Sequence, residues 1–335
     1  MNIVSHPLVD SFGRKHDYLR ISLTERCNLR CFYCMPEEGI PLKDKAHFMS
    51  NEEIFEISKI FTELGVNKIR LTGGEPLIRK CSSDIIRALG TLDTELAITT
   101  NGILVDKFID TFKEAGIQSV NVSFDSLKPE RQAMITRRDY FHRIIRNIHL
   151  LLDEGFHVKV NVVVMNNVNG DELIDFIEMT KKTPLHVRFI EFMPFSGNKW
   201  DWAKGIGYEN MMNTINAHYG HTSTLKLAEK PNETAKTYSV KGYKGTFGII
   251  SSVTNPFCSS CNRIRVTADG KMKNCLFSAQ ETDLLGPLRK GEDIVPLIRD
   301  SINSKKEMRA GMDTLNDLFN SSLIEKNRSM VSIGG

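Results

Sequence analysis

The sequence of 335 residues predicts an α/β fold, namely an incomplete (βα)6 barrel of the TIM type followed by a C-terminal extension. Short β-type segments and helical segments alternate six times, which favours a parallel sheet. This alternation stops near Pro194, where the chain changes to short, polar, turn-rich segments. We therefore expect one unit over residues 1–194 and a second unit over residues 195–335.

The expected elements follow from hydrophobic patterning and from helix-end signals. Residues 1–17 look like an irregular lead-in, and the segments Val105–Ala115 and Phe141–Glu154 are helical in pattern. A capping box over residues 50–53 opens another helix, which Gly65 ends. The expected strands are Tyr18–Leu23, Lys68–Thr72, Leu96–Thr100, Ser119–Phe124, His157–Val164 and His186–Ile190.

Apolar and polar side chains alternate along these strands. Helices must cover one face of a parallel sheet, so the apolar set belongs beneath them and the polar set faces the interior. Unpaired buried charge is costly, so inward cations imply a large anionic ligand. An antiparallel sheet with one solvated face is the alternative, because it would alternate in the same way. The cations expected to point inward are Arg20, Lys68, Arg70, Lys159 and Arg188.

Composition narrows the class of protein. The net charge is +3, which gives no support for a nucleic-acid or membrane surface, and no apolar stretch approaches the ~20 residues of a membrane span. Six of the seven cysteines fall into two tight groups, which fits metal ligation in a reducing compartment. We therefore expect a cytoplasmic protein. Cys81 stands apart, and we expect it to be a small, at least partly buried apolar residue.

The first cysteine group is a CxxxCxxC triplet formed by Cys27, Cys31 and Cys34. Thiolates suit iron–sulfur clusters, copper(I) or zinc, and three of them leave one metal position open for a small molecule. Two alternatives stay open. The triplet could be a zinc turn with a distant fourth ligand, or Cys31 and Cys34 could form a redox pair of the thioredoxin type.

The spacing of this triplet, with an aromatic residue before the last cysteine, resembles the signature of the radical S-adenosylmethionine (radical SAM) superfamily. The resemblance implies a [4Fe–4S] cluster whose fourth iron binds the amino and carboxylate groups of SAM. The Gly-Gly-Glu-Pro segment at 73–76 would be a tight turn if taken alone, but it resembles the superfamily segment that contacts the SAM amino group. The implied SAM contacts are Tyr33, Gly74, Glu75, Ser123 and Met193.

A second triplet follows in the C-terminal unit, with Cys258, Cys261 and Cys275. A second [4Fe–4S] cluster with an open iron fits three thiols. Zinc is the alternative, and it would need a carboxylate or a distant histidine because no histidine follows His221. Alternation places Arg263 and Arg265 on one face beside these cysteines, where a guanidinium can clamp a phosphate or a base.

Taken jointly, the two triplets, the GGEP segment, the intervening Asn-Arg-Ile-Arg and the terminal Gly-Gly resemble the GTP 3′,8-cyclase family of molybdenum cofactor biosynthesis. The family implies conversion of GTP to (8S)-3′,8-cyclo-7,8-dihydroguanosine 5′-triphosphate. A 5′-deoxyadenosyl radical removes hydrogen from C3′, and the second cluster binds guanine. The implied GTP contacts are Arg20, Arg70, Thr99, Lys159, Arg188, Arg263, Ile264 and Arg265; the implied catalytic residues are Arg20, Arg263, Arg265, Gly334 and Gly335.

The resemblance also implies partners. These are an electron donor such as flavodoxin or ferredoxin and a downstream cyclic pyranopterin monophosphate synthase, and a homodimer is a candidate assembly. Neither nucleic acid nor a membrane is expected. Two other functions stay open: a peptide-modifying radical SAM enzyme with two clusters, and a non-enzymatic iron–sulfur or zinc protein that binds RNA. The terminal glycines would ordinarily be a frayed end.

Overall fold

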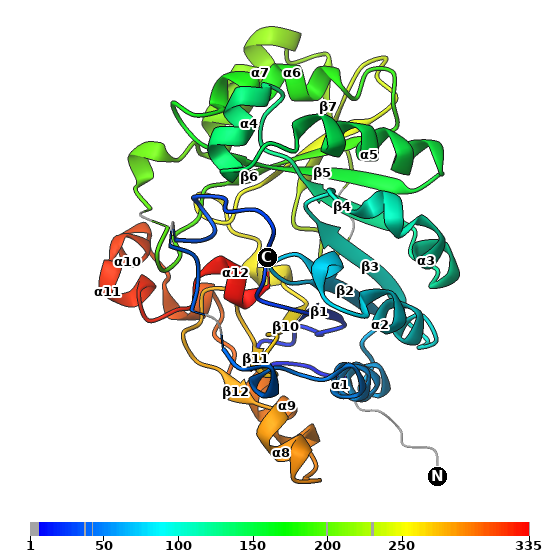
Figure 1. Ribbon diagram of the computed structural model, residues 1–335. Coiled ribbons are helices and arrows are strands. Elements are labelled where there is room, and N and C mark those ends of the chain that lie inside the picture. Colours follow the sequence, from blue (N-terminus) through cyan, green and yellow to red (C-terminus); the bar gives the residue numbers. More distant parts are fainter. Residues whose placement is uncertain (1–6, 37, 42, 199, 229–230, 335) are drawn as a thin grey trace.

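The structure, a computed structural model, describes residues 7–334 except 37, 42, 199 and 229–230. Its centre is a curved sheet in which six parallel strands follow one another in chain order (Figure 1). All six were predicted from the sequence, and parallel pairing excludes the antiparallel alternative. The strands are β1 (Tyr18–Ser22), β2 (Lys68–Thr72), β3 (Glu95–Thr100), β4 (Ser119–Ser123), β5 (His157–Val164) and β6 (His186–Glu191).

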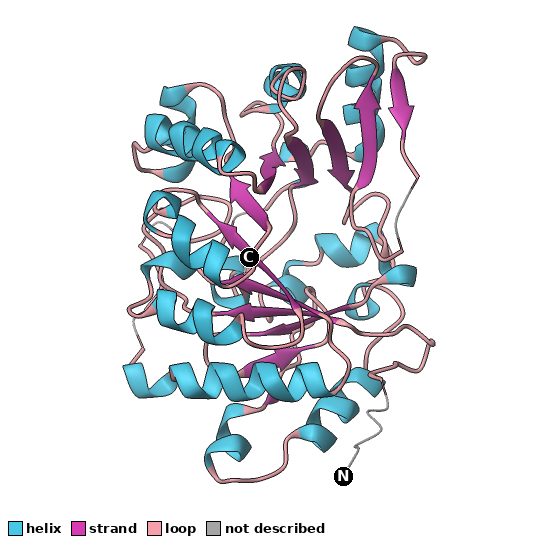
Figure 2. Ribbon diagram, turned by 90° about the vertical axis from the view of Figure 1, so that its right-hand side faces the viewer, coloured by secondary structure: helices cyan, strands magenta, loops and turns pink. Residues whose placement is uncertain are grey.

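Helices connect these strands and cover the outer face of the sheet (Figure 2). The apolar strand positions lie beneath them in one large buried core, as predicted. The expected helix Val105–Ala115 is interrupted at Phe108, so it becomes a short 3-10 turn followed by α3. The helices are α1 (Asn51–Glu63), α2 (Ser82–Leu89), α3 (Ile109–Glu114), α4 (Pro129–Thr136), α5 (Phe141–Asp153) and α6 (Leu173–Glu178).

The sheet does not end at six strands, which the sequence analysis did not foresee. Strand β9 (Thr246–Ile250) pairs in parallel with β6, and β10 (Arg263–Val266) pairs in parallel with β1. Antiparallel strands complete each side, giving a sheet of 12 strands in the described residues. These outer strands are β8 (Lys236–Val240) and β7 (Thr224–Lys226) on one side, and β11 (Lys271–Lys273) and β12 (Thr282–Asp283) on the other.

The remaining helices lie after β6. Helix α7 precedes the strands at one edge, and α8 to α12 follow the strands at the other. In Figure 1 the C-terminal helix α12 lies beside β1, β2 and β10, in the middle of the molecule. These helices are α7 (Tyr208–Tyr219), α8 (Leu285–Arg289), α9 (Val295–Asn303), α10 (Leu315–Phe319), α11 (Ser321–Ile324) and α12 (Met330–Ile333).

Strand register explains how cations from distant segments meet. Arg20 on β1 is the register partner of Arg70 on one side and of Arg265 on the other. Adjacent strands lie about 4.8 Å apart, so the three guanidinium groups start from neighbouring positions on the inner face. Across the sheet, Asn121 is likewise the partner of Lys159. The polar lining is therefore a property of the pairing as well as of alternation along each strand.

Arg14 and Cys81 show two further local features of the fold. Arg14, in the irregular lead-in, donates to the carbonyl oxygens of Cys258 at 2.9 Å and Glu307 at 2.7 Å, so this segment supports the second cysteine loop. Cys81 is exposed with φ of 60° before α2, which corrects the expectation that it would be at least partly buried.

Among the described residues, no helix has both the length and the apolar character needed to cross a bilayer.

The capping box that opens α1 is confirmed, and it makes a first prediction. The Ser50 hydroxyl accepts from the Glu53 backbone N–H at 3.2 Å, and the Glu53 carboxylate accepts from the Ser50 N–H at 2.6 Å. We expect Ser50→Ala to lower the free energy of unfolding by about 1 kcal/mol. Chemical denaturation would measure this, with the exposed Lys59→Ala on the same helix as control. An equal loss in both variants would contradict the cap as the cause.

Candidate active site

A cavity of about 810 Å³ lies inside the curved sheet. Its walls receive side chains from all six central strands and from the segments that follow β9. The five predicted inward cations all line it, and so do all six cysteines of the two triplets. Residues separated by most of the chain therefore share one partly open cavity, which includes the carboxyl ends of the strands, where active sites of β/α barrels form.

The first cysteine loop follows β1, and its backbone forms hydrogen bonds with the end of α4. The backbone N–H groups of Arg30 and Phe32 donate to the carbonyl oxygens of Thr136 at 2.9 Å and Ile135 at 3.2 Å. Burial, with Glu75 nearby, raises the pKa of Cys27 to about 11, and burial also raises the pKa values of Cys31 and Cys34. These thiols therefore stay protonated until a metal displaces their protons. Three partly buried sulfur donors that line one cavity fit an iron–sulfur cluster.

The second triplet lies on another part of the same wall. Cys258 is the first residue of a 3-10 turn, Cys261 directly follows that turn, and Cys275 follows β11. Burial opposes ionisation of Cys261, but Arg263 and Lys305 outweigh it and lower its pKa to about 6. Lys305 Nζ lies 3.5 Å from Cys261 Sγ. In the described part of the chain, no three His, Cys, Asp or Glu side chains form a site for a single metal ion.

The GGEP loop packs its backbone against the first cysteine loop. Gly74 N–H donates to the Thr24 carbonyl at 2.6 Å, and a Cβ at Gly74 would come within 2.3 Å of the Arg26 carbonyl oxygen. Only glycine fits here, and Gly74 lines the cavity as expected of a SAM contact.

Glu75 is placed differently from the expectation, because its carboxylate does not line the cavity. It is buried and accepts from the Thr100 hydroxyl at 2.8 Å and the Asn101 N–H at 2.7 Å. Burial, opposed by these hydrogen bonds, raises its pKa to about 7. The side chain joins the ends of β2 and β3. Glu75 is not among the residues that line the cavity.

Tyr33, Ser123 and Met193 all line the cavity. The Tyr33 hydroxyl donates to Asp125 at 2.7 Å, and Asp125 also accepts from the Val163 N–H at 2.9 Å. Burial raises the pKa of Asp125 to about 6 and, with that carboxylate beside it, raises the pKa of Tyr33. The aromatic residue of the cysteine motif is thus tied to the end of β4. Asp125 was not among the site residues expected from the sequence.

The positively charged side chains that line the cavity, which we call the cationic wall, lie close together and repel one another. Burial and neighbouring arginines lower the pKa of Arg20 to about 10, of Arg188 to about 9 and of Lys159 to about 8. They also lower the pKa of Arg265 well below its ordinary value. Arginine still stays protonated at neutral pH, so these shifts express the cost of crowding like charges in a low-dielectric space. An anionic ligand would relieve that cost.

Tyr18 is a cavity residue that sequence reasoning missed. Its hydroxyl accepts from Arg70 Nε at 2.5 Å. Burial opposes its ionisation, but Arg70 and Arg20 outweigh burial and lower its pKa to about 7. The signal was present in the sequence, because Tyr18 lies two residues before Arg20 and therefore on the same strand face.

The remaining residues expected to contact GTP fall into two groups: those whose side chains line the cavity and one whose side chain does not. Thr99 and Arg263 line the cavity, and the buried Nη2 of Arg263 has no hydrogen-bond partner among the described residues. Arg263 lies over the Phe257 ring, 4.6 Å from its centroid. The Ile264 side chain belongs instead to the apolar core, so only its backbone could meet a ligand.

The C-terminal tail is ordered against the cavity wall. Arg265 Nη1 donates to the Gly334 carbonyl oxygen at 2.7 Å. Gly334 has φ of +88°, and a Cβ there would lie 2.8 Å from Thr72 Oγ1 and 2.9 Å from Ser22 Cβ. A frayed end is therefore excluded as far as Gly334. Gly335 lies outside the described residues.

Two family models match this chain. Residues 21–180 match the family model of the radical SAM superfamily, and residues 185–310 match the model described as Molybdenum Cofactor Synthesis C. The fold resembles that of SuiB from Streptococcus suis bound to S-adenosylmethionine, with a TM-score of 0.65 and 14% identity over 99% of this chain and 78% of that one. At this identity the likeness concerns the fold alone.

Curated relatives are much more similar in sequence. The mitochondrial GTP 3′,8-cyclase of Arabidopsis thaliana is 44% identical over 100% of this chain and 85% of its own length. The GTP 3′,8-cyclase of Peptoclostridium acidaminophilum is 40% identical over 89% of this chain and 92% of its own. Molybdenum cofactor biosynthesis protein 1 of Mus musculus is 45% identical over 98% of this chain but 51% of its own length. The chain thus spans about half the length of its animal relatives.

The lowered pKa of Lys159 makes a prediction for the ligand-free protein. Between about 8 and the ordinary value of 10.5 the unfolded chain binds more protons, so stability rises with pH through that window. We expect Lys159→Met to be more stable than wild type at pH 7 by about 1–2 kcal/mol, allowing for solvent screening, with the difference vanishing toward pH 10.5. Denaturation at several pH values would measure it, with the exposed Lys107→Met as control. A constant difference would contradict the charge as the cause.

Proposed function

The chain belongs to the GTP 3′,8-cyclase family of the radical SAM superfamily, and we propose that it converts GTP to (8S)-3′,8-cyclo-7,8-dihydroguanosine 5′-triphosphate. The observation that carries this proposal is the single cavity shared by two cysteine triplets and a cationic wall. We also propose that residues 1–194 form the radical SAM unit and that residues 195–335 add the second cluster and much of the GTP site.

In this proposal the cysteines of the first loop hold a [4Fe–4S] cluster, and Gly74, Ser123, Met193 and the Tyr33 segment hold SAM. When bound, the cluster and SAM supply the 5′-deoxyadenosyl radical. The protein's part is positioning. The hydrogen bond from Tyr33 to Asp125 fixes the motif's aromatic ring, and the close backbone packing at Gly74 shapes the wall beside the cysteines.

The second triplet would hold a further [4Fe–4S] cluster that binds guanine, with Arg263 alongside. The triphosphate carries about four negative charges, which suits a wall of Arg20, Arg70, Lys159 and Arg188. Thr99 and the backbone of Ile264 would complete the GTP site. Arg20, Arg263, Arg265 and the terminal Gly334 and Gly335 would act on the reacting nucleotide. The crowded cations support this role because each gains from an anion in the cavity.

We keep the expected partners as part of the proposal: a flavodoxin or ferredoxin as electron donor, a cyclic pyranopterin monophosphate synthase downstream, and a homodimer as assembly. We also keep a cytoplasmic location, although the name of the Arabidopsis relative assigns that protein to mitochondria. A peptide-modifying reaction is the second candidate, since SuiB is also recorded with a precursor peptide. The cationic wall favours a triphosphate over a peptide.

The proposed function is tested with anaerobically reconstituted protein. We expect about eight irons per chain, and 5′-deoxyadenosine formed with dithionite and SAM only when GTP is present. Mass spectrometry should find the cyclised triphosphate. About four irons with one zinc per chain would disprove the second cluster. Two clusters without turnover of GTP would mean that the substrate is another molecule.

A cysteine of the second triplet, Cys275, and the isolated Cys81 give a matched pair of variants. We expect Cys275→Ala to lower the iron content from about eight to about four per chain and to abolish cyclisation. Cys81→Ala should change neither, because Cys81 is exposed and is not among the residues that line the cavity. Iron and sulfide analysis with the product assay measures both. Full iron content in Cys275→Ala would show that Cys275 is not a ligand.

A further inference from the structure

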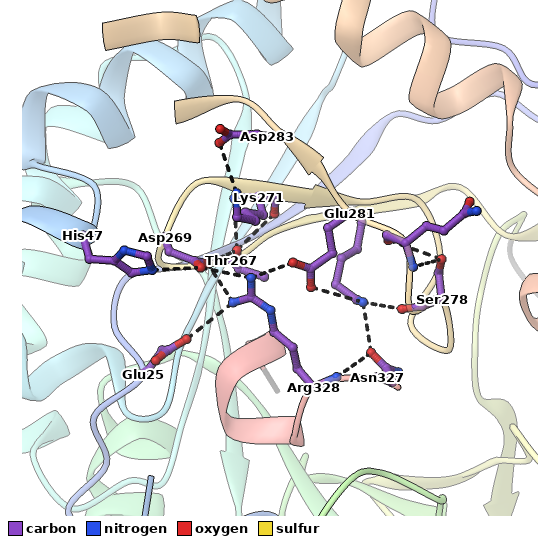
Figure 3. Close-up of polar contacts among 12 residues, drawn as sticks. Glu25, His47, Thr267, Asp269, Lys271, Ser278, Glu281, Asp283, Asn327 and Arg328 are labelled. Atoms are coloured by element: carbon purple, nitrogen blue, oxygen red, sulfur yellow. Dashed lines mark hydrogen bonds and ion pairs between the residues drawn. The ribbon is translucent and has the colours of Figure 1, made fainter. Parts of the chain in front are cut away.

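A cluster of buried charges holds the C-terminal tail to the body of the protein (Figure 3). Arg328 donates through Nη1 and Nη2 to the two carboxylate oxygens of Asp269, at 2.8 and 2.9 Å. Its Nη2 also donates to Glu281 at 2.6 Å, and its Nη1 lies 3.6 Å from Glu25. We call these four residues the tail clasp. It joins the tail to the β10–β11 turn, to the segment before β12 and to the first cysteine loop.

The neighbouring residue adds a second attachment. Asn327 Oδ1 accepts from Lys273 Nζ at 3.0 Å, and Asn327 Nδ2 donates to the Leu276 carbonyl at 3.0 Å. The Lys273 side chain is fully buried and lies 3.5 Å from Glu281. Since Lys273 and Leu276 flank Cys275, the tail is fixed beside both cysteine groups at once.

Charge explains why Arg328 is the central member. Glu25, Asp269 and Glu281 are all mostly buried, and Asp269 and Glu281 both reach Arg328 within hydrogen-bond distance. A planar guanidinium can serve several carboxylates from one fixed fork, which lysine cannot do. Without it these carboxylates would face one another with less positive charge between them.

The residues that follow Arg328 connect the tail clasp directly to the cavity. Five residues beyond Arg328, helix α12 ends and the Gly334 carbonyl accepts from Arg265 Nη1 at 2.7 Å. Val331 and Ile333 on α12 are buried, so the helix is packed as well as tethered. Arg265 is crowded by Arg20 and Arg263, which repel its charge. The Gly334 carbonyl therefore supplies a neutral acceptor that fixes the direction of this guanidinium.

We propose that Arg328 is a positioning residue for the reaction: by clasping Asp269 and Glu281 it sets the depth of the tail, so that the Gly334 carbonyl orients Arg265 in the cavity. The inference rests on the proposed function for its kinetic consequence. Docking of the tail, in contrast, can be observed without turnover.

The test compares Arg328→Gln, Arg328→Lys and a control in reconstituted full-length protein. Arg289→Gln is the control, because Arg289 also makes a two-pronged pair, with Glu53 at 2.7 and 3.0 Å, but on the surface. In Arg328→Gln we expect amide exchange in residues 329–334 to quicken by about tenfold or more. We expect kcat for cyclisation to fall about tenfold or more, with KM for GTP within about threefold. Arg328→Lys should be intermediate and Arg289→Gln unchanged.

The outcomes are separable. Unchanged tail exchange and kcat in Arg328→Gln would overturn the proposal. Faster exchange throughout residues 263–285 with a general loss of thermal stability would also overturn it, because Arg328 would then be a fold residue without a specific positioning role. If the wild-type protein itself did not convert GTP, the proposed function would fail, and the exchange comparison alone would still decide whether Arg328 docks the tail.

Discussion

Repulsion among like charges inside the barrel is the constraint on which the rest of the structure depends. Arg265, Arg20 and Arg70 lie in one row of the sheet because of strand register. Fixed acceptors hold them: Arg70 donates to Tyr18 and to the Ile98 carbonyl, and Arg265 donates to Gly334. Such contacts orient the cations without neutralising them, which leaves the cavity prepared for an anion.

Supporting contacts at both ends of the chain also use guanidinium groups. Arg14 ties the N-terminal lead-in to the second cysteine loop, and Arg328 ties the C-terminal tail to the turn after β10. Neither residue lines the cavity. Both use a guanidinium to bridge segments far apart in sequence, which fixes those segments relative to one another.

Much of this could be predicted because alternation along a strand determines which face a residue occupies. The strand bounds, the inward cations and the cysteine spacing were all local signals. Pairing between β1 and β10 is not local, so alternation along the strands could not by itself predict that Arg265 is the register partner of Arg20. Glu75 and Ile264 show a related limit: a motif names a position, whereas three-dimensional packing decides where its side chain lies, and both side chains are buried away from the cavity.

Pairing of β1 with β10 also has a consequence for how the molecule is made. During synthesis β1 can pair with β2 soon after both leave the ribosome, but its other edge stays open until the last quarter of the chain emerges. Closing so long a loop is slow. The first cysteine loop, at the end of β1, therefore has its strand paired on both edges only once β10 has been made.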